Sequence, residues 1–199
     1  SNIHNYLLAA KELVNRHYFA IRVGSLANPL ETTHDKIIDY ATRFHTDLMD
    51  LYLARKCQFF ISSCGGINVF PLFFRKPTLT VNVAHFINVP SWSGKDLFIP
   101  KKFWLCHEKR FMRFGEICQI KRHNLDTDYF RKSGIELVEN TPEELREGTI
   151  EMDERVKERW EENPEDVDLQ ERFWGIIETN GIYRPPQLRI CATFLRQNQ

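Results

Sequence analysis

The stretch QFFISSCGGINVFPLFFRKPTLTVNV, residues 58–83, decides the fold class. Its two ends, 58–62 and 78–83, are short apolar runs, which are typical of buried strands in a parallel sheet. Between them, the small residues of the turn at 63–66 lead into an apolar segment, 67–74, that we expect to be helical. A strand, a glycine turn, a helix and a second strand in this order predict an α/β fold.

The residues upstream extend the same alternation. Apolar residues at helical spacing predict a helix over 3–17, and apolar runs predict strands at 18–23 and 37–40. Thr46 has the chemistry of a helix N-cap, and the helix that follows runs to about Lys56. Its apolar residues cover two faces, so we expect this helix to be well buried. The alternation predicts one parallel sheet with right-handed crossovers.

The second half of the chain is predicted to be mostly helical. Residues 84–104 contain prolines and aromatic residues and are predicted to form a long loop. Thr141, followed by Pro142, has the chemistry of a helix start. We therefore expect a Rossmann-like domain over residues 1–125 and a helical extension over 126–199 that packs on it. The expected helices of this half span 107–119, 141–162 and 166–179.

Composition and charge exclude several classes of protein. The chain has 199 residues, 42% of them hydrophobic and 27% charged, which is typical of globular proteins and excludes wholesale disorder. Lys and Arg number 27, as do Asp and Glu, so a generally basic nucleic-acid-binding surface is excluded. No signal peptide and no long apolar run is present, so we expect a cytoplasmic protein.

Charge is nevertheless unevenly distributed along the chain. Residues 95–132 carry 10 basic and 5 acidic groups, which favours peripheral contact with anionic lipid at the inner membrane face or a merely solvated surface. Residues 141–171 carry 4 basic and 13 acidic groups and are expected to form a solvated helical face. The five cysteines show no CxxC or Cys/His spacing, so we expect neither a disulfide framework nor a metal site.

The turn after the strand at 58–62 is the first candidate binding site. Small residues there leave backbone N–H groups bare, and the N-terminus of a following helix favours negative charge. We therefore predict a site for an anion such as a diphosphate, and the alternative is a tight turn without a ligand. The candidate residues are Ser62, Ser63, Gly65, Gly66 and Asn68, whereas Cys64 is expected to be a small filler.

Other candidates lie at the ends of neighbouring strands. Arg22 stands just before Gly24, where it could grip a phosphate, or else form an ion pair with Asp39, Asp47 or Asp50. The group Asp39, Tyr40, Asp47 and Asp50 could bind a ribose or a base edge, although helix capping and surface ion pairs are the alternatives. His85 follows the strand at 78–83 and could line the same crevice, or be structural.

Several motifs in order carry a resemblance to a known family. YFAIRVGS at 18–25, KIIDYA at 36–41, the long stretch 46–82 and FLRQN at 194–198 resemble bacterial surface-carbohydrate glycosyltransferases. The stretch from Asp50 to Ser63 is also distantly similar to fucosyltransferases. The resemblance covers most of residues 3–125 and implies the nucleotide-sugar-binding half of a GT-B enzyme, whose N-terminal acceptor domain or a partner chain would complete it.

The resemblance also implies roles for the candidate residues. The turn from Ser62 to Gly66 would face the diphosphate with Arg22 and Gly24, and Asp39, Tyr40 and Asp50 would lie nearer the nucleoside. The donor would be a nucleotide-sugar and the acceptor a surface glycan or its precursor, with no metal and no other cofactor. In such enzymes the catalytic base often comes from the other domain, so we name none here.

Two rival functions use the same residues differently. A non-catalytic nucleotide-sugar-binding module would keep the crevice but lack an acceptor and a base. An interaction protein would use the sheet as a scaffold and bind its partner through the acidic helices at 141–171 and the aromatic segment at 84–104. Nucleotide binding and donor turnover distinguish the three functions.

Overall fold

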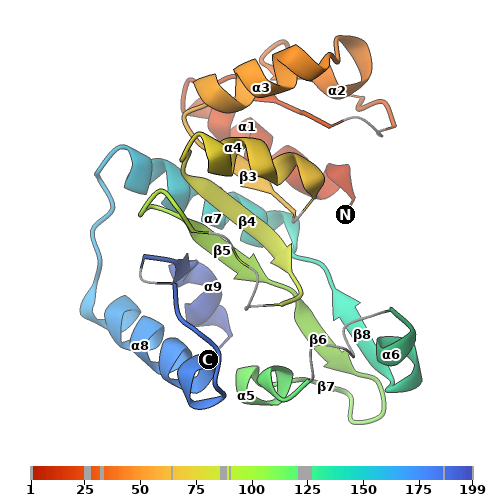
Figure 1. The fold of residues 1–199 in the computed structure, drawn as a ribbon, viewed down its shortest axis with the longest axis vertical. Helices are drawn as coiled ribbons and strands as arrows, with labels where there is room; N and C mark the ends of the chain where they lie inside the picture. Colours follow the sequence, from red (N-terminus) through yellow and green to blue (C-terminus); the bar gives the residue numbers. More distant parts are fainter. Residues whose placement is uncertain are drawn as a thin grey trace.

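A computed structural model describes residues 2–24, 28–31, 34–63, 65–85, 89, 91–120, 127–185 and 187–198. These residues form parallel strands covered by helices (Figure 1). The described elements, with η for a 3₁₀ helix, are η1 (Ile3–Tyr6), α1 (Leu7–Asn15), β1 (Ala20–Ile21), β2 (Ile37–Ile38), α2 (Tyr40–Arg43), α3 (Asp47–Lys56), β3 (Phe60–Ser62), η2 (Gly66–Asn68), α4 (Val69–Phe73), β4 (Thr78–Val83), β5 (Leu97–Pro100), β6 (Lys102–Leu105), β7 (Arg110–Phe111), α5 (Phe114–Cys118), α6 (Thr127–Lys132), β8 (Ile135–Val138), α7 (Pro142–Val156), α8 (Pro164–Thr179), β9 (Arg189–Ile190) and α9 (Ala192–Gln197).

The main sheet has four parallel strands in the order β3-β4-β5-β9. All residues of β4 and β5 are buried, because helices cover both faces, and Leu79, Leu97 and Ile190 lie in the core between them. The expected α/β class with a parallel sheet is therefore confirmed. The strand at 58–62 was expected inside the sheet, but β3 is a half-buried edge strand of the described sheet.

The first two strands do not join this sheet. β1 and β2 pair with each other in a separate parallel ladder, with Ala20 opposite Ile37 and Ile21 opposite Ile38. The expectation of a single sheet is therefore wrong at this point. A third, antiparallel sheet of order β7-β6-β8 extends beyond the end of β5 and lies beside α6 in the lower part of Figure 1.

One layer of helices nevertheless covers both parallel sheets. α7 packs on β4 and β5, α1 packs on α7, and α1 also contacts β1 and β2. On the other side, α3 and α4 pack on each other, and in Figure 1 α4 lies in front of β3 and α3 lies above it, whereas α7 lies behind the main sheet. The two sheets therefore share a common helical layer.

Three predictions for the second half are wrong in part. The predicted loop at 84–104 contains β5 and most of β6, because Pro100 stands at the end of a strand, where its missing N–H does not interrupt a ladder. The predicted helix at 107–119 is a hairpin turn, β7 and the short α5. The predicted helix at 141–162 ends at Val156, and Asn163 caps the next helix. Residues 126–199 also supply β8 and β9.

Two predictions of burial are wrong as well. α3 begins after Thr46 as predicted, with the Thr46 hydroxyl accepting a hydrogen bond from Met49 N, but Leu48 is 79% exposed. Only Asp50 and Ala54 of α3 are buried, and most of its large apolar side chains are exposed: Leu48, Met49, Leu51 and Tyr52. The acidic helices are not simply solvated either, because Glu151 and Asp153 are buried and paired with cationic side chains.

Candidate functional site

A cavity of about 630 Å³ lies between the two parallel sheets. Its walls are the residues of β1 and β3 with their flanking residues, one face of η1 and α1, and two residues of α3. Most of the lining is apolar, and polar groups lie at both ends of the two strands: Arg22, Ser62 and Ser63 at the carboxyl ends, and Tyr18, Lys56 and Gln58 at the amino ends. Crevices at the carboxyl ends of parallel strands are the usual ligand sites of α/β proteins.

The structure brings four of the predicted site residues to this cavity. Arg22 follows β1, Ser62 ends β3, and Ser63 and Gly65 belong to the turn after β3. All four line the wall of the cavity. This arrangement agrees with the prediction that Arg22 and the turn lie close together. Cys64, which was expected to be a small filler in the turn, lies outside the described residues.

Arg22 also makes the ion pair that we considered as its alternative role. Its guanidinium Nη1 lies 3.3 Å from Asp39 Oδ1 and donates a hydrogen bond of 2.7 Å to Asn28 O. Asp39 is buried and also accepts hydrogen bonds from Leu30 N and the Thr42 hydroxyl. Burial alone would raise the pKa of Asp39, but these hydrogen bonds and Arg22 hold it below its usual range. Asp39 therefore orients Arg22.

Tyr40 and Asp50 lie outside the lining of the cavity. The Tyr40 hydroxyl donates a hydrogen bond to Thr46 O and accepts one from Thr46 N, so it fixes the connection between α2 and α3. Asp50 Oδ2 lies 3.1 Å from His45 Nε2 in the same region. In this structure both side chains hold the start of α3 in place, and a contact with a nucleoside would require them to move.

The backbone is open at Gly65 and Gly66, in the turn after β3. A Cβ atom added to Gly65 or Gly66 would meet nothing within 4 Å, so a ligand has room to approach the main chain. The Ser62 hydroxyl donates a hydrogen bond to the Asn68 side-chain oxygen, which closes the turn. The following helix is a 3₁₀ turn and the five-residue α4, so its dipole is smaller than that of a full helix.

Gly24 and His85 have different surroundings. Gly24 has a φ of +132°, a conformation that L side chains rarely adopt, so glycine is required where the chain leaves β1. His85 is half-buried beyond the end of β4 and does not line the cavity. Burial lowers its pKa, which favours the neutral imidazole.

Lys56 is a cavity-lining cation that the sequence analysis missed. It lies in the last turn of α3, immediately before β3, and lines the cavity at the amino end of that strand. A basic residue in the last turn of a helix is ordinarily explained by the helix dipole. The signal that could have found it is its position just ahead of the strand that carries the candidate turn.

The described residues contain no candidate metal centre and no candidate membrane span. Among residues 2–24, 28–31, 34–63 and the later described ranges, no three His, Cys, Asp or Glu side chains form a group that could hold a metal ion. None of the described helices combines the length and apolar character that crossing a membrane requires.

Comparison of the chain with protein-family models, with curated proteins and with solved structures finds no match. The geometry of the cavity and the motifs of the sequence are therefore the basis for a function.

Proposed function

We propose that this chain binds the diphosphate of a nucleotide-sugar between Arg22 and the turn from Ser62 to Gly65. It would act as the donor-binding half of a GT-B glycosyltransferase that transfers the sugar to a surface glycan or its precursor. One observation carries the proposal: Arg22 and the turn, which are about 40 residues apart in the chain, line one cavity at the ends of two parallel strands.

The chemistry of these groups fits a departing diphosphate. A guanidinium forms paired hydrogen bonds with phosphate oxygens, and open backbone N–H groups bind anions without side chains. Asp39 holds Arg22 in place but offsets part of its charge, so binding requires the phosphate to share the guanidinium. In the transfer reaction the same groups would stabilise the negative charge that develops on the leaving diphosphate.

The test is a panel of nucleoside diphosphates and nucleotide-sugars, with thermal unfolding as the readout. A ligand at about 100 times its dissociation constant adds about 2.7 kcal/mol, which raises the midpoint by several degrees. We expect one base to be preferred. Arg22→Gln should reduce the shift, whereas Arg43→Gln, which changes an exposed arginine of α2, should not.

The outcome that contradicts the proposal is equally concrete. If no nucleotide shifts the midpoint, or if Arg22→Gln and the unmodified chain respond equally, Arg22 is not a phosphate ligand. Because Arg22 also pairs with Asp39, the midpoint of each variant without ligand is measured first. Transfer or hydrolysis of the preferred donor then separates an enzyme from a non-catalytic binding module.

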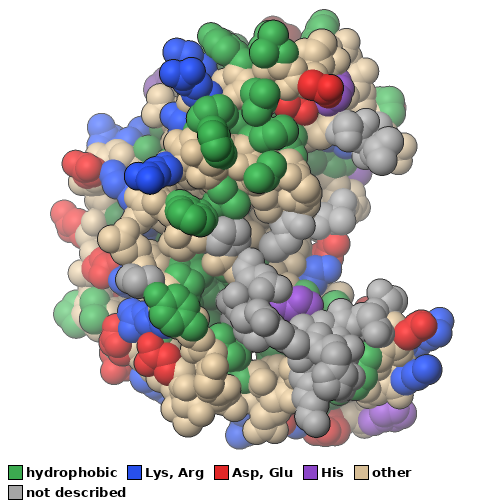
Figure 2. Space-filling model, viewed as in Figure 1, with side chains coloured by type: hydrophobic (Ala, Val, Ile, Leu, Met, Phe, Trp, Pro, Cys, Tyr) green, Lys and Arg blue, Asp and Glu red, His purple; other side chains and the backbone are tan. Residues whose placement is uncertain are grey.

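An interaction role is the second candidate, and one observation favours it. Leu48 and Tyr52 of α3 and Val69 and Phe73 of α4 are all more than half exposed. Hydrophobic side chains gather over these two helices in the upper part of Figure 2. Clustered apolar surface of this kind is typical of protein contact sites. Absence of any nucleotide response together with concentration-dependent association would favour this function over the first.

A further inference from the structure

Among the described residues, the two strands that border the cavity each have an unpaired edge. In β1, Ala20 N and Arg22 N donate hydrogen bonds to Lys36 O and Ile38 O in and beside β2. Because alternate residues of a parallel strand bond to opposite neighbours, the main-chain groups of Ile21 point the other way, into the cavity. The same reasoning applies to β3, where Phe60 N bonds to Pro77 O beside β4 and Ile61 faces the cavity.

The two edges run in the same direction along the cavity. At the amino ends of the strands, the rings of Tyr18 and Phe59 lie 6.0 Å apart in an edge-to-face contact. At the carboxyl ends, Arg22 and Ser62 line the same cavity. Among the described residues, β1 pairs only with β2 and β3 only with β4. Two parallel sheet edges therefore face each other across an apolar space, and an edge of this kind is a template for another strand.

The helical layer does not stop at the gap. η1 and α1 line the cavity through Ile3, Tyr6, Leu7 and other mostly apolar residues, and α1 packs on α7, which covers the main sheet. A layer of helices that continues from one sheet to the next is what a single sheet with one strand missing would show. Helices pack on the faces of parallel sheets in this way.

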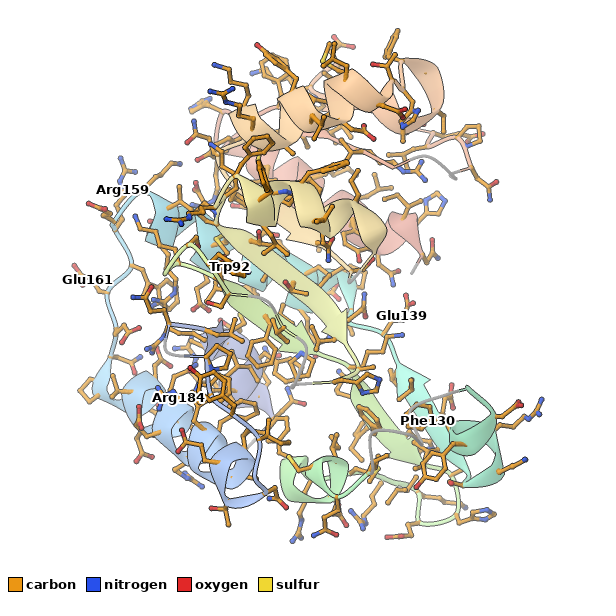
Figure 3. The ribbon with its side chains drawn as sticks, in the orientation of Figure 1. Trp92, Phe130, Glu139, Arg159, Glu161 and Arg184 are labelled. Atoms are coloured by element: carbon orange, nitrogen blue, oxygen red, sulfur yellow. The ribbon has the colours of Figure 1, made fainter. Side chains whose placement is uncertain are left out.

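The start of α1 shows where the polypeptide enters this layer. Asn2 N donates a hydrogen bond of 3.2 Å to Glu139 Oε2, and Figure 3 shows Glu139 in the segment between β8 and α7. Tyr6 Oη accepts a hydrogen bond from Asn82 Nδ2 at the end of β4. η1 therefore lies at the carboxyl edge of the main sheet, and α1, which continues from it, ends three residues before Tyr18, shortly before β1. A helix with this course is the crossover helix of a β-α-β unit, which a parallel strand precedes.

We propose that the cavity is the binding site of a β-strand that runs parallel to β1 and β3 between them and leads into α1. The completed sheet would have the order β2-β1-inserted strand-β3-β4-β5-β9. The strand would be uncharged and rich in Val and Ile, because α1 covers one of its faces and the cavity lining is mostly apolar. Main-chain hydrogen bonds to Ile21 and Ile61 would hold it on both sides.

This inference does not depend on the proposed function, although the two meet at one place. The carboxyl end of the inserted strand would lie between Arg22 and the turn at Ser62, where it would supply a third strand-to-helix turn. In doubly wound sheets the ligand crevice lies at the position where the strand order reverses. The inserted strand would occupy that position.

The experiment adds an N-terminal extension of about five Val and Ile residues and a polar connection of about two or three residues to the chain. Hydrogen exchange of the Ile21 and Ile61 amides is compared with that of a control extension of equal length with Pro at alternate positions. We expect exchange at both amides to slow by at least about tenfold with the Val and Ile extension only. The Val81 amide, in the centre of the main sheet, serves as the internal reference.

A second measurement keeps the test decisive if the extended chain misfolds. The same strand is added as a free peptide to the chain of 199 residues, and amide chemical shifts are followed. Perturbation centred on Ile21 and Ile61 supports the proposal. Equal exchange with both extensions, together with no perturbation by the peptide at these residues, overturns it and leaves the cavity to a small ligand.

Discussion

Asp153 shows how one buried carboxylate connects the two parallel sheets through their helices. Its side chain is fully buried in α7 and accepts hydrogen bonds from Tyr18 Oη at 2.6 Å, Arg16 Nη1 at 2.8 Å and Lys157 Nζ at 2.9 Å. Burial alone would raise the pKa of Asp153, but these donors outweigh it and hold the pKa below its usual range. Burial and the bond to Asp153 raise the pKa of Tyr18 to about 12.

Replacing this carboxylate tests the connection. Asp153→Asn should lower the free energy of unfolding by about 3 kcal/mol, because Arg16 and Lys157 lose a buried charged partner. Asp168→Asn is the control, since Asp168 and its partner Arg172 are both exposed and such pairs contribute at most about 1 kcal/mol. Urea denaturation measures both variants, and equal losses would show that Asp153 is not a structural connection.

The pH dependence of stability follows from the same pKa. The folded-state pKa of Asp153 lies below its unfolded value, so its stabilisation is complete above about pH 4 and is lost as the pH falls through the folded pKa. The loss of stability between about pH 4 and pH 2 should therefore be steeper for the unmodified chain than for Asp153→Asn. Urea midpoints across this range measure the difference, and parallel curves would contradict the assignment.

Residue-level prediction from the sequence succeeded where the interaction is local. Thr46 and Thr141 were predicted as helix caps, and each accepts a hydrogen bond from the backbone of the following turn. Arg22 is different, because the sequence left open whether it pairs with Asp39 or meets a ligand. Asp39 is 17 residues away, and only the folding of β1 against β2 brings the two side chains together.

At the scale of elements, long periodic segments were predictable and short strands were not. The predictions for β4, α3 and the start of α7 are confirmed because each has a continuous pattern or a cap. β9 has only two residues, and its place beside β5 comes from contacts across the chain. The burial of α3 was predicted wrongly, because apolar spacing shows that a helix has an apolar face but not whether another element covers it.

The exposed face of α3 and α4 gives a prediction at this scale. Leu48→Ser and Phe73→Ser should each change the free energy of unfolding by no more than about 0.5 kcal/mol, because these side chains are 79% and 80% exposed. Met152→Ala in α7 should cost about 2–5 kcal/mol, because Met152 is fully buried in the main core. Chemical denaturation distinguishes the two groups. A loss of unfolding free energy well above about 0.5 kcal/mol in either surface variant would show that other residues pack on this face of α3 and α4.

At the scale of the whole molecule, the chain has two hydrophobic cores of unequal size. The larger lies around the main sheet and includes Leu79, Ile99 and Trp174. The smaller lies under β1 and β2 and consists of Val14, Leu30 and Ile37 with a few half-buried neighbours. The sequence predicted strands on both sides but not their separation, because an apolar strand pattern does not specify which neighbour completes a ladder.

Unequal cores predict unequal local stability. The amide of Ile38 is bonded within the β1–β2 ladder. We expect it to exchange through a local opening whose free energy is at least about 2 kcal/mol lower than that of the global unfolding that exposes the Val81 amide. Few apolar residues form the core of the small ladder, and the pairing of Arg16 and Tyr18 with Asp153 helps to attach it to α7. Native-state hydrogen exchange in low denaturant measures both amides, and Asp153→Asn should lower the Ile38 value further. Equal opening free energies for Ile38 and Val81 would mean that the two sheets unfold as one unit.

The extended chain gives a related prediction. If the proposed strand binds between the sheets, the opening free energy of the Ile38 amide should come closer to that of Val81, because the two ladders then become one sheet.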